Sequence, residues 1–142
     1  MADVKAIVTG SDERSFTLAG YGVLFGGADL EGETFTKETD FWTAHMPEHP
    51  PVLYQHGQDA AIKRTVLGHA TVTVQDVGLW VETQIDLANE YAAAIRELAE
   101  KGLLGWSSGA VGHLVEREGK TIKAWPIAEF SLTPTPAEPR TL

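Results

Sequence analysis

The sequence predicts a mainly β fold, an antiparallel β-barrel of about seven strands with helices packed outside it. β-rich runs recur along the 142 residues, only one segment has a clear helical pattern, and strands do not alternate with helices. Regular alternation would indicate a doubly wound parallel sheet, so that fold is disfavoured. With 43% apolar residues the chain can build one core. We expect one domain over residues 1–133 and a stiff, proline-rich tail over 134–142.

The predicted strands are the β-rich runs between turn residues. They span residues 6–8, 16–25, 52–56, 65–74, 78–87, 106–116 and 121–132. Glycines interrupt the second run, and glycine inside a strand is typical of a bulge or a barrel corner. Pro50 and Pro51 favour extended backbone in the third run. Residues 75–77 join the fourth and fifth runs as a hairpin.

The fifth run has the clearest alternation. One set of positions carries Leu79, Val81, Thr83 and Ile85, and the other carries Trp80, Glu82, Gln84 and Asp86. A period of two with one mostly apolar set predicts a strand with one buried face. Residues 117–119 separate the last two runs and predict a turn.

Residues 88–101 have the clearest helical pattern. Apolar side chains recur there at helical spacing, at Tyr91, Ala94, Ile95 and Leu98. Asp86 or Asn89 can cap the start of this helix, and Gly102 can close its end.

A second, shorter helix is predicted after the polar, glycine-rich loop 26–36. Thr36 is the expected N-cap, Phe41 and Trp42 form the apolar side, and the helix ends before Pro47.

The composition excludes several classes of function. Twenty acidic residues against eleven Lys and Arg give a net charge of −9, which disfavours binding to nucleic acid. There is no cysteine, so disulfides, thiolate metal sites and cysteine nucleophiles are absent. The N-terminus lacks the apolar stretch of a signal peptide, and no run of about 18 apolar residues could span a membrane. We expect a soluble, intracellular protein.

Gly105-Trp106-Ser107-Ser108-Gly109 is the most informative motif. Flanking glycines let the backbone bend and let another chain approach closely, which suits a nucleophilic serine. Strand alternation places Ser107 and Ser108 on opposite faces, so only one can meet a base, and periodicity does not choose between them. Taken alone, the motif favours a plainer interpretation, a glycine-flanked bend with incidental serines.

His56 and Glu129 are the candidate base and acid. His56 ends an apolar run beside a flexible loop, where it could act as a general base or simply bind a loop carbonyl. Glu129 lies in a run that is apolar on both faces, where a buried carboxylate needs a partner such as His56. The alternative is an edge strand with Glu129 facing water. Together with a serine they would make a hydrolytic triad in the order His, Ser, Glu.

Two other sites are rejected. A G-x-S-x-G elbow of the α/β-hydrolase type lies between a strand and a helix, whereas here a helix precedes the serine and a strand follows it. The only later histidine, His113, lies roughly 20 Å from Ser107 along a strand and cannot act as its base. His45 and His49 have helical metal-ligand spacing, but Pro47 lies between them, so no metal site is predicted. The four tryptophans are assigned to the core.

In order and spacing, four segments resemble the prohead (capsid maturation) proteases of tailed phages, which share a fold with the herpesvirus assemblins. They are Val52-Leu53-Tyr54-Gln55-His56, Leu67-Gly68, Gly105-Trp106-Ser107-Ser108-Gly109, and Glu129-Phe130-Ser131-Leu132 with the following Thr133-Pro134-Thr135-Pro136-Ala137. The resemblance covers roughly residues 5–139. His69 after Leu67-Gly68 and Ala110 after the second glycine depart from the family pattern.

The resemblance implies a serine endopeptidase that uses no cofactor. Its nucleophile would be Ser107, its general base His56 and its orienting acid Glu129; no motif identifies the oxyanion-hole donors. The implied partners are the major capsid protein and scaffold, with the protease itself as a further implied substrate, inside the immature prohead in the host cytoplasm. A homo-oligomer is a further expected partner, with no nucleic acid and no membrane. Two rivals are an inactive capsid-assembly protein and a small β-barrel binding module.

Overall fold

The computed structural model describes residues 3–27, 32–44 and 48–134, and in them the chain is mainly strands. The strands are β1 Ile7–Ser11, β2 Ser15–Leu24, β3 Pro51–Tyr54, β4 Gly68–Val74, β5 Gly78–Asp86, β6 Gly105–Ala110, β7 Glu116–Glu118, β8 Thr121–Ala124 and β9 Ile127–Thr133. The described helices are α1 Ala92–Glu100 and two short 3-10 turns, η1 Gln55–Gly57 and η2 Gly112–Leu114.

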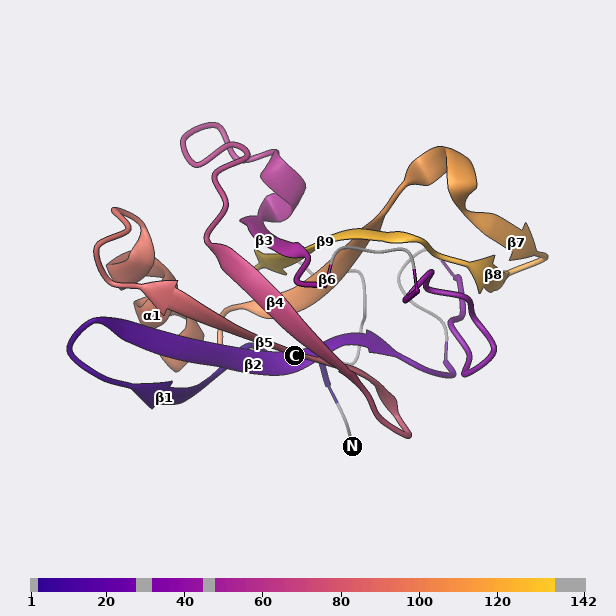
Figure 1. The fold of residues 1–142 in the computed structure, drawn as a ribbon, viewed down its shortest axis with the longest axis horizontal. Coiled ribbons are helices and arrows are strands. Elements are labelled where there is room, and N and C mark those ends of the chain that lie inside the picture. Colours follow the sequence, from indigo (N-terminus) through magenta and orange to yellow (C-terminus); the bar gives the residue numbers. More distant parts are fainter. Residues whose placement is uncertain (1–2, 28–31, 45–47, 135–142) are drawn as a thin grey trace.

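Seven strands form one sheet in the order β1-β2-β5-β4-β3-β9-β6, which curls into a half-barrel (Figure 1). The chain before β1 also reaches β6 at the opposite end of this order. There the Ala6 N–H donates to the Leu104 carbonyl at 3.0 Å, and the Trp106 N–H donates to the Val4 carbonyl at 2.7 Å. Backbone hydrogen bonds therefore link the two ends of the sheet.

The predicted antiparallel barrel is only partly right, because the sheet is mixed. β3 and β9 run parallel, with Val52 opposite Phe130 and Tyr54 opposite Leu132. The other neighbouring strands of this sheet are antiparallel. Strands joined by a tight turn must be antiparallel, but β3 and β9 lie far apart in the sequence and no hairpin sets their direction. This parallel pair places the end of β3 beside the C-terminal end of β9.

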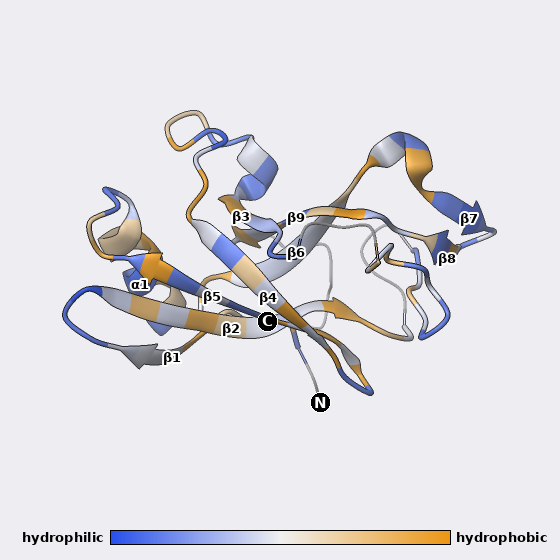
Figure 2. Cartoon of the chain, viewed as in Figure 1, coloured by the Kyte–Doolittle hydropathy of each residue, from blue (hydrophilic) through white to orange (hydrophobic). Residues whose placement is uncertain are grey.

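The hydrophobic core is one buried cluster with side chains from β2, β5, β6 and β9, and α1 adds Ala92, Ile95 and Ala99 to it. Alternation along β5 is as predicted, since Leu79, Val81, Thr83 and Ile85 are all buried. Phe130 and Leu132 of β9 are fully buried as well, so β9 supports the core with one face. Figure 2 shows bands of higher and lower hydropathy alternating along β2, and it shows β7 as hydrophilic throughout.

The tryptophans divide between core and surface. Trp106 is buried, and Trp125 packs against the core cluster. Trp42 and Trp80 are partly exposed, and the Trp80 ring meets the edge of Tyr21 with centroids 5.0 Å apart. Assignment to the core is therefore confirmed for Trp106 and Trp125 only.

The short helix predicted after Thr36 is wrong within residues 36–44, and residues 45–47 lie outside the described part. Thr36 caps a single turn, in which its hydroxyl accepts the Glu38 N–H at 3.2 Å. The chain then runs beside β8, where the Asp40 N–H donates to the Lys123 carbonyl at 2.9 Å. Tertiary pairing therefore outweighs the local capping signal.

The main helix is confirmed but shorter than predicted, because α1 begins at Ala92. Asp86 and Asn89 accept the N–H groups of Ala88 and Tyr91, both at 2.8 Å, so they hold the turn before the helix and not its first residues. Gly102 closes the helix with φ of 71°, as predicted.

The last two predicted strands are each interrupted. β6 ends at Ala110 and η2 follows, and the run 121–132 divides into β8 and β9 at Pro126, which has no N–H to donate. β7 and β8 form a separate two-stranded sheet at one end of the molecule (Figure 1). The predicted boundary between a domain at 1–133 and a tail at 134–142 stays a prediction, because residues 135–142 lie outside the described part.

Candidate active site

His56 lies in the tight turn η1, two residues past the end of β3. Its φ of 55° and the φ of 51° at Gln55 are both in the left-handed region, which residues with side chains adopt rarely. The His56 N–H donates to the Ser131 hydroxyl at 2.9 Å, and the Thr133 hydroxyl donates to the Gln55 side chain at 2.6 Å. β9 therefore holds this turn, and the strand predicted over 52–56 ends at Tyr54.

Glu129 is the partner of the His56 ring. Its Oε1 lies 2.5 Å from His56 Nδ1, and its Oε2 accepts the Ser131 hydroxyl at 2.6 Å. The Glu129 side chain is only 12% exposed, and β9 lies between β3 and β6. The water-facing edge-strand alternative for Glu129 is therefore wrong.

The hydrogen bond that His56 donates to Glu129 raises the pKa of His56 above its ordinary value. Partial burial of the ring acts in the opposite direction, and the negative charge of Glu129 adds to the increase. With its proton on Nδ1 and bonded to Glu129, a neutral imidazole presents the lone pair of Nε2 on its other side.

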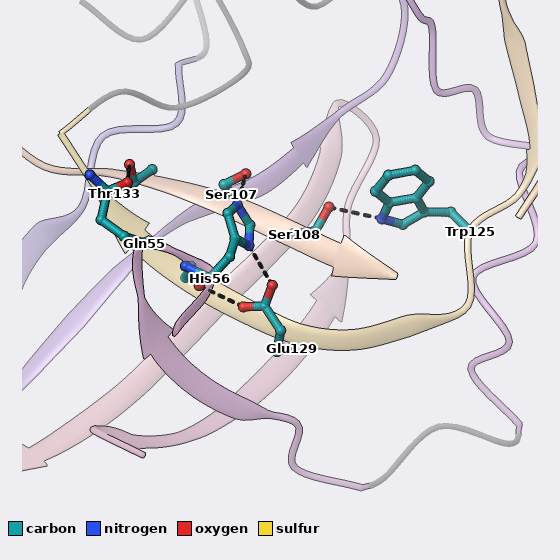
Figure 3. A network of polar contacts seen from close by, with 8 residues as sticks. Gln55, His56, Ser107, Ser108, Trp125, Glu129 and Thr133 are labelled. Atoms are coloured by element: carbon teal, nitrogen blue, oxygen red, sulfur yellow. Dashed lines mark hydrogen bonds and ion pairs between the residues drawn. The ribbon is translucent and has the colours of Figure 1, made fainter. Parts of the chain in front are cut away.

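Ser107 lies on that other side of the ring. Its Oγ is 3.2 Å from His56 Nε2. The Ser108 hydroxyl instead accepts the Trp125 indole N–H at 3.1 Å. Figure 3 shows the His56 ring between Ser107 and Glu129, with Ser108 directed away toward Trp125. The structure thus brings Ser107, His56 and Glu129 together and leaves Ser108 out.

Gly109 allows the carboxylate to occupy this position. Gly109 is opposite Glu129 in the pairing of β6 with β9, and a Cβ at Gly109 would overlap Glu129 Oε1. The sequence motif predicted the close approach of another chain to the serine, whereas the structure shows the Glu129 side chain approaching the backbone of β6 at Gly109.

Ser131 is a site residue that sequence reasoning missed. It is fully buried and contacts both the His56 backbone and the Glu129 carboxylate. A signal was available, because residues two apart on a strand share a face, so Ser131 had to lie beside Glu129.

The remaining histidines lie elsewhere. His113 is exposed in η2 and takes no part in the hydrogen bonds that join Ser107, His56 and Glu129. His69 is exposed on β4. His49 Nδ1 lies 3.2 Å from the Ala70 carbonyl oxygen. His45, with which no shared metal site was predicted, lies outside the described residues. In residues 3–27, 32–44 and 48–134, no three metal-binding side chains gather.

The sequence as a whole matches a known protein family, and this match shows what kind of protein carries the site. The model of the caudovirus prohead serine proteases matches residues 2–142. The chain belongs to this family. No curated protein and no solved structure matched the chain.

Family membership confirms the resemblance that the four sequence segments indicated. It places the chain among the serine proteases of bacteriophage capsid maturation. The curled, mainly β sheet of this prohead protease also agrees with the predicted fold class. In the described part of the chain, no helix is both long and apolar enough to cross a membrane.

Proposed function

We propose that Ser107, His56 and Glu129 are the catalytic triad of a serine endopeptidase. The observation that carries the proposal is one continuous line of contacts, from Ser107 Oγ to His56 Nε2 at 3.2 Å and from His56 Nδ1 to Glu129 Oε1 at 2.5 Å. A nucleophile, a base and an orienting acid in this sequence of contacts are what acyl transfer requires.

In the proposed reaction, Ser107 Oγ bonds to the carbonyl carbon of the scissile peptide, and its proton passes to His56 Nε2. Glu129 stabilises the imidazolium and keeps the ring oriented. The tetrahedral intermediate collapses as the C–N bond breaks, and the leaving amine takes the proton from His56. Water then attacks the acyl-enzyme with His56 as base, and the Ser107 hydroxyl is restored.

The proposed substrates follow from the family. Capsid and scaffold protein segments inside the immature prohead, in the host cytoplasm, would be cleaved during maturation, and the protease could cleave itself. The net charge of −9 suits an enzyme that does not bind the packaged DNA.

The neighbouring serines offer a matched test of the proposal. Each variant, Ser107→Ala and Ser108→Ala, is co-expressed with the major capsid protein of the same phage, and the masses of the products are measured by mass spectrometry. We expect Ser107→Ala to lower cleavage roughly 10⁴-fold or more. Ser108→Ala is expected to retain cleavage, since it loses only the bond from Trp125.

A fluorophosphonate probe gives a second readout that needs no natural substrate. Labelling at Ser107 supports the proposal, whereas labelling at Ser108, or unchanged cleavage by Ser107→Ala, contradicts it. If the folded wild-type protein in assembled proheads is neither labelled nor active, the inactive assembly protein or the binding module replaces the protease assignment.

A further inference from the structure

The Ser131 hydroxyl lies between the two groups that orient the imidazole. It accepts the His56 backbone N–H at 2.9 Å and donates its own proton to Glu129 Oε2 at 2.6 Å. Ser131 is 0% exposed. One side chain thus fixes the main chain of His56 and the carboxylate that holds the His56 ring.

The Glu129 carboxylate needs this second contact to stay in place. Its terminal torsion is intrinsically broad, so a single bond to His56 leaves the carboxylate free to rotate. With Oε2 bonded to Ser131 and Oε1 bonded to His56, both oxygens have fixed directions. The position of the carboxylate then selects the imidazole tautomer that has its proton on Nδ1.

The backbone of His56 needs the other contact. Its left-handed conformation is uncommon for a residue with a side chain and persists only when its surroundings hold it. The Ser131 Oγ is the acceptor for the amide at this position. Loss of the hydroxyl would leave that amide, and Glu129 Oε2, each without this partner.

We propose that Ser131 is a positioning residue of the active site: it holds His56 and Glu129 in register and so keeps the imidazole in its Nδ1–H tautomer, with Nε2 facing Ser107. This inference rests on the proposed function for its catalytic consequence. Its structural part, the control of the His56 tautomer, is independent of catalysis.

Thr83 provides a matched control for a purely structural role. Its hydroxyl is also buried in the sheet, at 3% exposure, and donates to the His69 carbonyl at 3.0 Å. Thr83→Val and Ser131→Ala therefore each remove one buried hydroxyl and one donated hydrogen bond. Only Ser131 contacts the proposed triad.

The first experiment is long-range ¹H–¹⁵N NMR of the imidazole side chains, at a pH where His56 is neutral. We expect wild type and Thr83→Val to show His56 with its proton on Nδ1. Ser131→Ala is expected to show a mixture of both tautomers. An unchanged Nδ1–H tautomer in folded Ser131→Ala would overturn the proposal.

The second experiment measures the rate of fluorophosphonate labelling at Ser107. Misplacing a reacting group by about 1 Å costs about 100-fold, so Ser131→Ala should label about 10- to 100-fold more slowly. Thr83→Val should stay within about threefold of wild type. In a Glu129→Ala background, Ser131→Ala should have much less further effect, because most of its influence passes through the carboxylate. Full additivity of the two substitutions would contradict this.

The two readouts separate the two proposals. If wild type is not labelled but Ser131→Ala still changes the tautomer, the peptidase assignment fails and the positioning role stands. If Ser131→Ala does not fold, Ser131→Cys fills the site with a slightly larger group that is a weaker donor and acceptor. The same two measurements on Ser131→Cys then test the proposal. We expect a partial loss of the Nδ1–H tautomer and of the labelling rate, and wild-type values of both would contradict the proposal.

Discussion

Gly109 and Glu129 face each other across β6 and β9, and the Glu129 carboxylate fills the space that a side chain at Gly109 would need. The second glycine of the serine motif therefore has a steric role. It leaves room for the acid and not for the serine itself. The geometry of the proposed triad therefore depends on the absence of a Cβ at Gly109.

Gly109→Ala should therefore displace Glu129 from His56. Because the added methyl overlaps the same oxygen that bonds to His56 Nδ1, we expect fluorophosphonate labelling of Ser107 to fall about 100-fold. Overpacking should also lower the free energy of unfolding by about 1–3 kcal/mol. Labelling kinetics and urea unfolding measure the two effects.

Gly112→Ala is the control for that substitution. A Cβ at Gly112 meets nothing within 4 Å, and its φ is not in the left-handed region. This variant should label at nearly the wild-type rate. Equal losses in the two variants would show that the effect comes from the glycine backbone and not from the carboxylate.

The raised pKa of His56 determines the pH dependence of nucleophile activation. The base must be neutral to accept the Ser107 proton, so labelling should rise with pH through a pKa above the ordinary value of about 6.5. Glu129→Gln removes the charge and the strongest acceptor, while burial of the ring remains. Its acid limb should therefore move to lower pH, and its maximum rate should fall roughly 10³- to 10⁴-fold.

Substitution of other histidines controls for that assignment. His69→Gln and His113→Gln change exposed side chains away from the triad contacts, so both should keep the wild-type pH profile. A shift of the acid limb in either variant would assign the titration to a residue other than His56.

The same pKa shift predicts a pH-dependent contribution to stability. Because folding raises the pKa of His56, its interaction with Glu129 stabilises the fold fully below the unfolded pKa of about 6.5 and loses this effect as pH rises through the folded pKa. The difference in unfolding free energy between wild type and Glu129→Gln should thus be larger near pH 5.5 than at pH 9. Urea unfolding at the two pH values measures it, and a difference that grows with pH would contradict the assignment.

Phe130 connects the site to the core, since it lies between Glu129 and Ser131 and faces the opposite side of β9. It is fully buried, and a Cβ at Gly22 would overlap its ring. Phe130→Ala should lower the free energy of unfolding by about 3–5 kcal/mol. Val74→Ala, at a side chain that is 65% exposed, should change it by about 0.5 kcal/mol or less. Urea unfolding compares the pair, and similar losses would contradict the placement of Phe130 in the core.

Local patterns predicted the strands better than they predicted the helices. Alternation in β5 and the turn before it were correct, because burial on one face leaves a period of two in the sequence. The capping pattern at Thr36 was misleading, because the chain there pairs with β8 and a capping residue serves a turn as well as a helix.

The amino-acid sequence by itself determined which residues could share a strand face. Alternation separates Ser107 from Ser108 and places Ser131 beside Glu129, because successive side chains on a strand point in opposite directions. Resemblance to a family added the expected role of each residue, but not their distances.

Only the tertiary structure decided which of these faces meet. The parallel pairing of β3 with β9 and the left-handed turn at His56 bring the imidazole between Glu129 and Ser107. Neither feature has a local signal, because the pairing of distant strands depends on burying the whole sheet, and the turn is held by a hydroxyl that lies far along the chain.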